Sequence, residues 1–295
     1  MADGVAQGMS LAEALADPAH CRSMGAFGLE IDFDLSRPLS SEDAEHFRQT
    51  FYREKILRFR AQSLSMKEQE RIVTYVGAVL PGSGSGYLSP EDKILGTSRL
   101  DYHSDLCATP MPIDVISLHG LDIVENTSTT DFVSGARAYA LLSEAQRSRI
   151  AALEVNLVQT LADKTRLTYD VPEDAFNLVR PLVMEHRITG ERIIYASISS
   201  AARIEGFGRE ESAALLGELF EVLYDPSNEV RHSWRPGDFL IWDNLALQHG
   251  RPPLDPAIPR RMQRVASGRR SLREQVPGYN LSTIIGDQAD SARAQ

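Results

Sequence analysis

The sequence predicts a mostly β protein with flanking helices, folded as a jelly-roll type double sheet. The main observation is a series of short runs rich in β-branched and aromatic residues, which is typical of strands. These runs lie at residues 113–124, 153–161, 182–188, 192–197 and 239–242. Few helical patterns interrupt them, and many short strands with a few covering helices are typical of a jelly roll.

The N-terminal third is expected to alternate strands and helices. Residues 29–33 and 55–59 alternate apolar and polar side chains, as half-buried strands do. A helix is expected over residues 40–54, because it opens with the helix-start pattern Ser-Ser-Glu-Asp. A second helix is expected from the capping box at residues 65–68, with Gly77 as its C-terminal stop.

Three later segments complete this outline. Residues 135–151 and 209–224 carry leucines and isoleucines at helical spacing, so both are expected to be amphipathic helices. Thr189-Gly190 favours a hairpin turn. The Gly-Ser-Gly-Ser-Gly run at residues 82–86 predicts a flexible loop, either a lid or a plain connection. It lacks the lysine and spacing of a phosphate-binding loop.

The composition is that of a globular protein. The chain has 295 residues, of which 42% are hydrophobic and 24% are charged. No internal repeat or linker divides it, so we expect a single domain over residues 1–295. The polar, weakly patterned ends, about 1–25 and 272–295, are expected to be flexible.

Charge and cysteine content narrow the partners. A formal net charge of −10 argues against nucleic acid, whose partners usually carry basic patches. An anionic small substrate stays open, because a site can be basic while the surface is acidic. No apolar run is long enough to cross a membrane. Two cysteines and no signal-peptide pattern favour the cytoplasm. A homo-oligomer is left open.

The strongest functional signal is a set of two histidines and one aspartate. His103 and Asp105 are one residue apart, so on a strand their side chains would point to the same face. His249 follows the buried run at 239–242. Two imidazoles and one carboxylate form the ligand set of non-haem Fe(II) oxygenases, which leaves the other metal positions open. Because His103 alone is weak evidence, the interpretation depends on the surroundings of His249.

Two arginines after His249 indicate an acidic co-substrate. On a strand, Arg260, Met262 and Arg264 would share a face, and Val265 beside them is apolar. Buried guanidinium groups are costly unless anions meet them, and arginine binds a carboxylate with two parallel hydrogen bonds. A salt bridge to a nearby Asp or Glu is the alternative for each arginine.

With these motifs, the chain resembles the taurine/α-ketoglutarate dioxygenase family, which includes the 2,4-dichlorophenoxyacetate dioxygenase type. The resemblance covers residues 28–268. It depends on Leu-Ser-Arg-Pro-Leu-Ser at 35–40, Tyr-His-Ser-Asp at 102–105, Trp-Asp-Asn at 242–244 with His249, and Arg-Arg-Met-Gln-Arg at 260–264.

The resemblance implies a double-stranded β-helix and a role for each residue. His103, Asp105 and His249 would be the ligands of Fe(II). Arg260 matches the arginine that pairs with the distal carboxylate of the co-substrate 2-oxoglutarate, and Thr130 matches the threonine that helps to hold it. A further residue, Arg264, matches an arginine that contacts the co-substrate or an anionic substrate group in some members.

The chain also departs from the family pattern. Position 104 is serine where the family usually has threonine, and residues 127–129 replace a frequent Gly-Gly-Asp. Arg99 and Leu100 stand where taurine-using members have an asparagine, and the 82–86 run replaces a histidine-containing substrate loop. Taurine itself is therefore disfavoured as substrate, and Arg99 either binds an anionic group or faces solvent.

The sequence thus predicts an Fe(II)- and 2-oxoglutarate-dependent dioxygenase that uses O2 and releases succinate and CO2. Its substrate would be a small organic molecule, hydroxylated or desaturated. Two alternatives are a zinc-dependent hydrolase on the same three ligands and a non-catalytic binding protein of the same fold. Substrate identity does not follow from the sequence.

Overall fold

The computed structural model describes residues 9–90, 96–158, 169–171 and 176–275. The helices are α1 (Leu11–Ala16), α2 (Ser41–Glu54), α3 (Met66–Thr74), α4 (Gly135–Leu141), α5 (Glu144–Ile150), α6 (Arg209–Leu223) and α7 (Leu272–Gln275), with a 3₁₀ turn at Pro226–Asn228. The strands are β1 (Cys21–Ser23), β2 (Leu29–Ile31), β3 (Ile56–Phe59), β4 (Ser85–Leu88), β5 (Leu100–His103), β6 (Val115–Ile123), β7 (Thr129–Ser134), β8 (Glu154–Val158), β9 (Asn177–Pro181), β10 (Val183–Glu185), β11 (Arg192–Ile194), β12 (Ala201–Ile204), β13 (Glu229–Ser233), β14 (Phe239–Asp243), β15 (Leu247–Arg251) and β16 (Arg260–Ser267).

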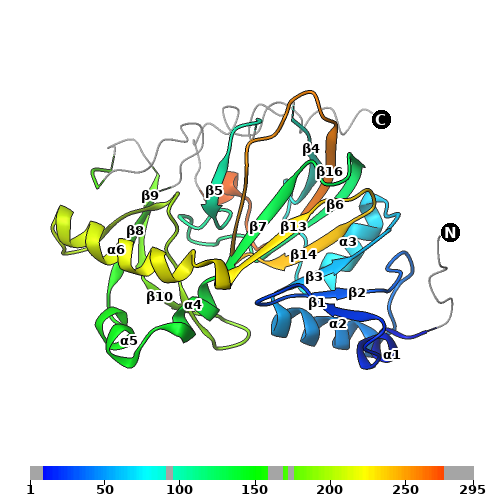
Figure 1. Ribbon diagram of the computed structural model, residues 1–295, viewed down its shortest axis with the longest axis horizontal. Helices are drawn as coiled ribbons and strands as arrows, with labels where there is room; N and C mark the ends of the chain where they lie inside the picture. Colours follow the sequence, from blue (N-terminus) through cyan, green and yellow to red (C-terminus); the bar gives the residue numbers. More distant parts are fainter. Residues whose placement is uncertain (1–8, 91–95, 159–168, 172–175, 276–295) are drawn as a thin grey trace.

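Two sheets form the centre of the molecule (Figure 1). The major sheet has the strand order β1-β2-β3-β14-β6-β16-β4, and the minor sheet has the order β13-β7-β15-β5. Their inner faces share one buried cluster, which joins Trp242 and Met262 of the major sheet to Phe132 and Leu247 of the minor sheet. The rings of Phe132 and Trp242 meet edge to face at 5.2 Å. This is the predicted jelly roll, a double-stranded β-helix.

The outer face of the major sheet is covered by the N-terminal helices. Phe47 and Phe51 of α2 and Ile72 of α3 are fully buried against Phe59 and Phe239 of the sheet. Burying a side chain of this size stabilises the fold by about 1.5–3 kcal/mol. Serine side chains cap α2 and α3 where the sequence predicts it, at residues 40 and 65.

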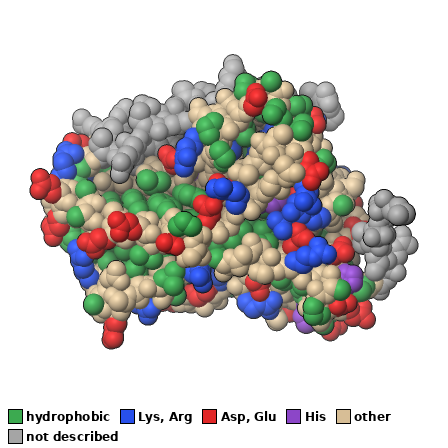
Figure 2. All heavy atoms as spheres, in the orientation of Figure 1, with side chains coloured by type: hydrophobic (Ala, Val, Ile, Leu, Met, Phe, Trp, Pro, Cys, Tyr) green, Lys and Arg blue, Asp and Glu red, His purple; other side chains and the backbone are tan. Residues whose placement is uncertain are grey.

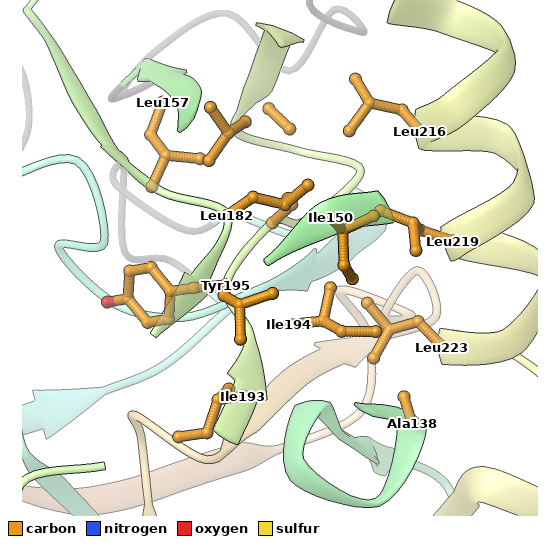
Figure 3. Close-up of a cluster of buried hydrophobic side chains, with 14 of the residues drawn as sticks. Ala138, Ile150, Leu157, Leu182, Ile193, Ile194, Tyr195, Leu216, Leu219 and Leu223 are labelled. Carbon is orange, nitrogen blue, oxygen red and sulfur yellow. The ribbon is translucent and has the colours of Figure 1, made fainter. Parts of the chain in front are cut away.

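A second lobe carries its own core beside the minor sheet. Leu219 and Leu223 of α6 point toward Ile150 and Ile194, and Leu216 points into the same cluster, as Figure 3 shows. The strands β8, β9 and β12 form a small sheet of this lobe, and β10 and β11 form a hairpin. Its predicted Thr189-Gly190 turn is confirmed, since Gly190 has a φ of +71° and lies between the two strands.

Several expectations are wrong in detail. Residues 135–151 form two helices, because Ser143 leaves the helical conformation and caps α5 in a capping box with Gln146. Within the N-terminal segment expected to be flexible, Ser10 caps α1, whose Leu11 is fully buried. The 82–86 run is a loop only in part, because Ser85 begins β4. The expected strand at 153–161 is seen as β8, and its last residues lie outside the described part.

The surface of the described part shows mixed charge. On the face in Figure 2, basic side chains lie among acidic ones. Within the residues described, no helix is both long and apolar enough to span a membrane.

A buried polar cluster links the two sheets at the end of β13. His232 is fully buried, with its Nδ1 3.3 Å from Nη1 of Arg58 and its Nε2 3.3 Å from Oδ2 of Asp238. Arg60 also pairs with Asp238. Burial lowers the pKa of His232 to about 4, and the two arginines add to this effect, although Asp238 opposes it.

This cluster predicts a loss of stability in acid. Between pH 6.5 and about 4 the unfolded chain holds a proton at His232 that the folded chain does not, so the free energy of unfolding falls as pH falls. From pH 7 to pH 5 the His232 contribution is about 2 kcal/mol. Urea unfolding at pH 7 and pH 5 measures this effect. In His232→Gln the difference in the free energy of unfolding between the two pH values should be about 2 kcal/mol smaller. If the free energy of unfolding of the variant falls as much between pH 7 and pH 5 as that of the wild type, His232 is not the group responsible.

Candidate metal centre

Two strands of the minor sheet hold the predicted histidines side by side. His103 ends β5 and His249 lies in β15, where the two residues are direct cross-strand partners. Their rings are 4.3 Å apart between centroids. Gly250 allows this close approach, because a Cβ at that position would lie 2.8 Å from the carbonyl oxygen of Leu100. The antiparallel register thus brings two distant parts of the sequence together.

Asp105 reaches the histidines from a turn, and not from a strand as the sequence pattern suggests. β5 ends at His103, and the chain turns at Asp105 with Leu106 at a φ of +57°. The side chain of Asn244, the residue after β14, hydrogen-bonds both backbone groups of Asp105. The expected convergence is present, although its local geometry differs.

The three side chains have the spacing of a metal site. Their ligand atoms all lie within 4.8 Å of one another, and no other group of three His, Cys, Asp or Glu among the described residues does so. Oδ1 of Asp105 is 3.3 Å from Nε2 of His103 and 3.8 Å from Nε2 of His249. Nδ1 of His103 lies 2.8 Å from the carbonyl oxygen of Asp101, so it donates there and Nε2 keeps its lone pair for a metal.

The electrostatics favour a charged carboxylate and a neutral His249, whereas the hydrogen bond and charge of Asp105 raise the pKa of His103 against the opposing effect of burial. Burial alone would raise the pKa of Asp105, but the hydrogen bond with His103 and the charge of Arg264 outweigh it and hold this pKa well below its usual range. Burial, helped by the charges of His103 and Arg264, lowers the pKa of His249 to about 3. A neutral imidazole and an ionised carboxylate are the forms that bind a metal ion.

Arg264 contacts the metal-site carboxylate directly. Its Nη2 donates to Oδ2 of Asp105 at 2.8 Å. The salt bridge considered from the sequence is therefore the contact observed, and its acid is one of the expected ligands. Because Arg264 takes Oδ2, the other oxygen of Asp105 faces the two histidines.

Arg260 is a buried cation without an acidic partner in the described residues. It is 9% exposed, and its Nε makes no hydrogen bond. Burial, with the nearby guanidinium of Arg251, lowers the pKa of Arg260 to about 10. A buried, unpaired guanidinium is costly, and a second cation nearby increases the cost. Of the two sequence interpretations, the structure thus favours an external anion over an internal salt bridge.

Thr130 lies in β7 with its hydroxyl already engaged on one side. Its Oγ1 accepts a 2.9 Å hydrogen bond from the indole Nε1 of Trp234, and both residues are buried. Because Oγ1 accepts from the indole, the hydroxyl proton is free to be donated elsewhere. Thr130 and Phe132 are two residues apart on β7, so their side chains lie on the same face of the sheet. Phe132 is the cross-strand partner of His249. Thr130 thus points to the side of the sheet that carries the metal-site histidines.

The donor set fits Fe(II). Two imidazole nitrogens and one carboxylate on one side leave the opposite side free, as the facial ligand set of non-haem Fe(II) oxygenases requires. The orphaned guanidinium of Arg260 also fits an anionic co-substrate.

Three further residues were missed as functional candidates in the sequence. Asn244 stands in the Trp-Asp-Asn motif, and its position at the end of the predicted strand 239–242 was the available signal. Arg251 follows His249 by two positions, so strand periodicity could have placed both on one face. For Trp234 nothing in the sequence indicates its bond to Thr130.

Comparison with known proteins identifies the family. Residues 18–266 match the family model described as taurine catabolism dioxygenase TauD, TfdA family. The chain is 26% identical to an alkylsulfatase of Acinetobacter baylyi, over 76% of this chain and 77% of that protein. It is 27% identical to pentalenolactone F synthase of Streptomyces arenae, over 57% of this chain and 61% of the synthase, so it matches about three fifths of that relative.

A solved structure shows the same architecture. The crystal structure of a taurine dioxygenase from Burkholderia xenovorans superposes with a TM-score of 0.72 and 26% identity, over 84% of this chain and 90% of that chain. The family match extends over most of the described chain and includes all three residues of the candidate metal centre. The chain therefore belongs to the TauD/TfdA family, and it is a non-haem dioxygenase that uses Fe(II), 2-oxoglutarate and O2.

Proposed function

We propose that this chain oxidises a small, anionic organic substrate and converts 2-oxoglutarate and O2 to succinate and CO2. The observation that carries the proposal is the convergence of His103, Asp105 and His249 within 4.8 Å at their ligand atoms. These three side chains would hold Fe(II). Bound Fe(II), with 2-oxoglutarate and O2, supplies the oxidising chemistry, and the protein supplies position and exclusion of water.

Arg260 and Thr130 would bind the distal carboxylate of 2-oxoglutarate. Arg260 offers a buried guanidinium that lacks an acid in the described residues, and Thr130 offers a hydroxyl proton. A bidentate arginine–carboxylate pair with one added hydroxyl fixes both the position and the rotation of a carboxylate. The co-substrate would also remove the cost of burying Arg260 beside Arg251.

Arg264 would orient Asp105. By binding Oδ2 at 2.8 Å it keeps that oxygen away from the metal and presents Oδ1. Such partners of metal-binding carboxylates tune both geometry and affinity. This role differs from the one the family resemblance implies, in which the arginine touches the co-substrate or substrate.

The relatives support a small anionic substrate. An alkylsulfatase of Acinetobacter baylyi, a sulfate ester dioxygenase of Pseudomonas putida and a phenoxypropionate dioxygenase of Sphingobium herbicidovorans are among them.

Arg99 is exposed and already paired with Asp101 at 2.8 Å, so the structure favours the solvent-facing interpretation of that arginine. Both cysteines are free, which supports work in a reducing cytoplasm.

Succinate formation tests this function directly. The purified protein with Fe(II), ascorbate and labelled 2-oxoglutarate is expected to release labelled succinate, and a true substrate should increase the rate. Small sulfate esters, sulfonates and aryloxy acids form the first panel, and product mass separates hydroxylation from desaturation. Zinc in place of iron should abolish the reaction. Substrate turnover with zinc, or no succinate with any panel member, would contradict the proposal.

A further inference from the structure

Asn244 makes an unusual set of contacts for a residue outside the metal ligands. It is fully buried. Its Oδ1 accepts from the backbone N–H of Asp105 at 3.0 Å, and its Nδ2 donates to the carbonyl oxygen of Asp105 at 3.1 Å. The same Nδ2 donates to the carbonyl oxygen of Ile113 at 2.9 Å. One side-chain amide thus satisfies both backbone polar groups of an expected metal ligand.

These contacts replace a strand partner that Asp105 lacks. Asp105 lies in a turn beyond the end of β5, followed by Leu106 in the left-handed region. A residue in a turn lacks the backbone hydrogen bonds to a neighbouring strand that would fix its conformation. Backbone polar groups that are buried need other partners. The amide of Asn244 pairs with Asp105 as a neighbouring strand would. Asn244 is itself held, since its backbone N–H donates to the carbonyl oxygen of Asp114 at 3.0 Å.

The adjacent residue supports the other side of the centre. Oδ1 of Asp243 accepts from the backbone N–H groups of Leu245 and Ala246, at 3.0 and 3.1 Å. These bonds shape the turn between β14 and β15, the strand that carries His249. Successive residues therefore hold the segments of two expected ligands that are far apart in sequence.

We propose that Asn244 is a positioning residue, which fixes the backbone of Asp105 so that the carboxylate held by Arg264 presents Oδ1 to His103 and His249. The inference rests on the proposed function, because it takes Asp105 as a metal ligand. Asparagine is specific for this task. Its amide supplies one acceptor and two donors, whereas an ionised aspartate supplies no donor and an aliphatic side chain supplies neither.

The test compares Asn244→Ala with a matched control, Asn228→Ala. Asn228 is also fully buried, and its Nδ2 likewise donates to two carbonyl oxygens, those of Ser134 and Leu223. Both variants should lower the unfolding midpoint of the metal-free protein. Titration with Mn(II) in the presence of 2-oxoglutarate should show affinity about ten- to hundredfold weaker in Asn244→Ala only.

The outcomes separate the role of Asn244 from the proposed function. If the wild-type protein binds no Mn(II), the metal centre is wrong, and the role of Asn244 is wrong with it. If wild type binds and Asn244→Ala binds equally well, only the positioning role is overturned. Equal weakening in Asn228→Ala also overturns it, because the effect is then general destabilisation.

Two further measurements cover the case in which Asn244→Ala does not fold. Asn244→Asp keeps the acceptor for the Asp105 N–H and should bind Mn(II) with affinity between those of wild type and the alanine variant. In the wild-type, metal-free protein, the backbone amide of Asp105 should be protected from hydrogen exchange. If this amide exchanges as fast as an unprotected loop, the positioning role of Asn244 is refuted without any variant.

Discussion

Succinate formation is expected to fall to background when His249 is replaced by alanine. The imidazole of His249 is one of three groups whose ligand atoms lie within 4.8 Å, so its loss leaves two donors. Two donors hold a metal less firmly and fix fewer of its positions, because affinity depends on ligand count and geometry. Mn(II) binding by calorimetry and succinate release from labelled 2-oxoglutarate measure the two effects separately.

The matched control for His249→Ala is His119→Ala. His119 is also buried, and its Nε2 lies 3.1 Å from the carbonyl oxygen of Gln62, but it belongs to no metal-ligand group in the described residues. Both variants lose a buried imidazole and should be less stable. When equal amounts of folded protein are compared, His119→Ala should bind metal and turn over substrate as the wild type does. Retained Mn(II) affinity in His249→Ala would exclude His249 as a ligand.

The second large effect is expected for Arg260→Leu. If Arg260 binds the distal carboxylate of 2-oxoglutarate, its removal costs about 2–5 kcal/mol of binding, because a buried charge pair loses one partner. This corresponds to roughly a 30-fold to several-thousand-fold higher KM for 2-oxoglutarate. Mn(II) binding without co-substrate should be nearly unchanged, since within the described residues Arg260 makes no hydrogen bond or ion pair with His103, Asp105 or His249. Steady-state kinetics with varied 2-oxoglutarate provide the measurement.

Arg261→Leu is the control, because Arg261 lies next to Arg260 on β16 but is exposed and stacks over the ring of Tyr87. Its KM for 2-oxoglutarate should match wild type. The KM of Arg260→Lys for 2-oxoglutarate should lie between those of the wild type and Arg260→Leu, since lysine keeps the charge but loses the bidentate geometry. An unchanged KM in Arg260→Leu would refute the carboxylate role.

The sequence predicts the major sheet better than the minor one. Strands β6 and β14 are rich in apolar residues because most of their residues are buried on both faces, and such segments are visible in a sequence. Strands β5, β7, β13 and β15 were not identified from periodicity. They carry charged and polar residues, such as the cross-strand pair Arg231 and Asp131 at 2.9 Å. The sheet that holds the site therefore has the weakest strand signal.

The site itself could be predicted by residue type, but its geometry could not. The three candidate ligands were proposed from chemistry and from the family resemblance, and the structure brings them together. The turn at Asp105 was not predicted, because its backbone is hydrogen-bonded by Asn244, a contact across 139 positions of sequence. The ion pair between Arg264 and Asp105 likewise spans 159 positions. Contacts of this kind follow from strand order and register, which local patterns do not determine.

The antiparallel alignment of β15 restricts how this chain can change length. Since side chains alternate between the faces of a strand, inserting or deleting one residue between Leu247 and His249 would turn the imidazole outward and place a neighbour in its position. The segment between β15 and β16, residues 252–259, has no such constraint. Natural indels and engineered insertions should therefore be tolerated there while the histidine and Arg260 keep their places.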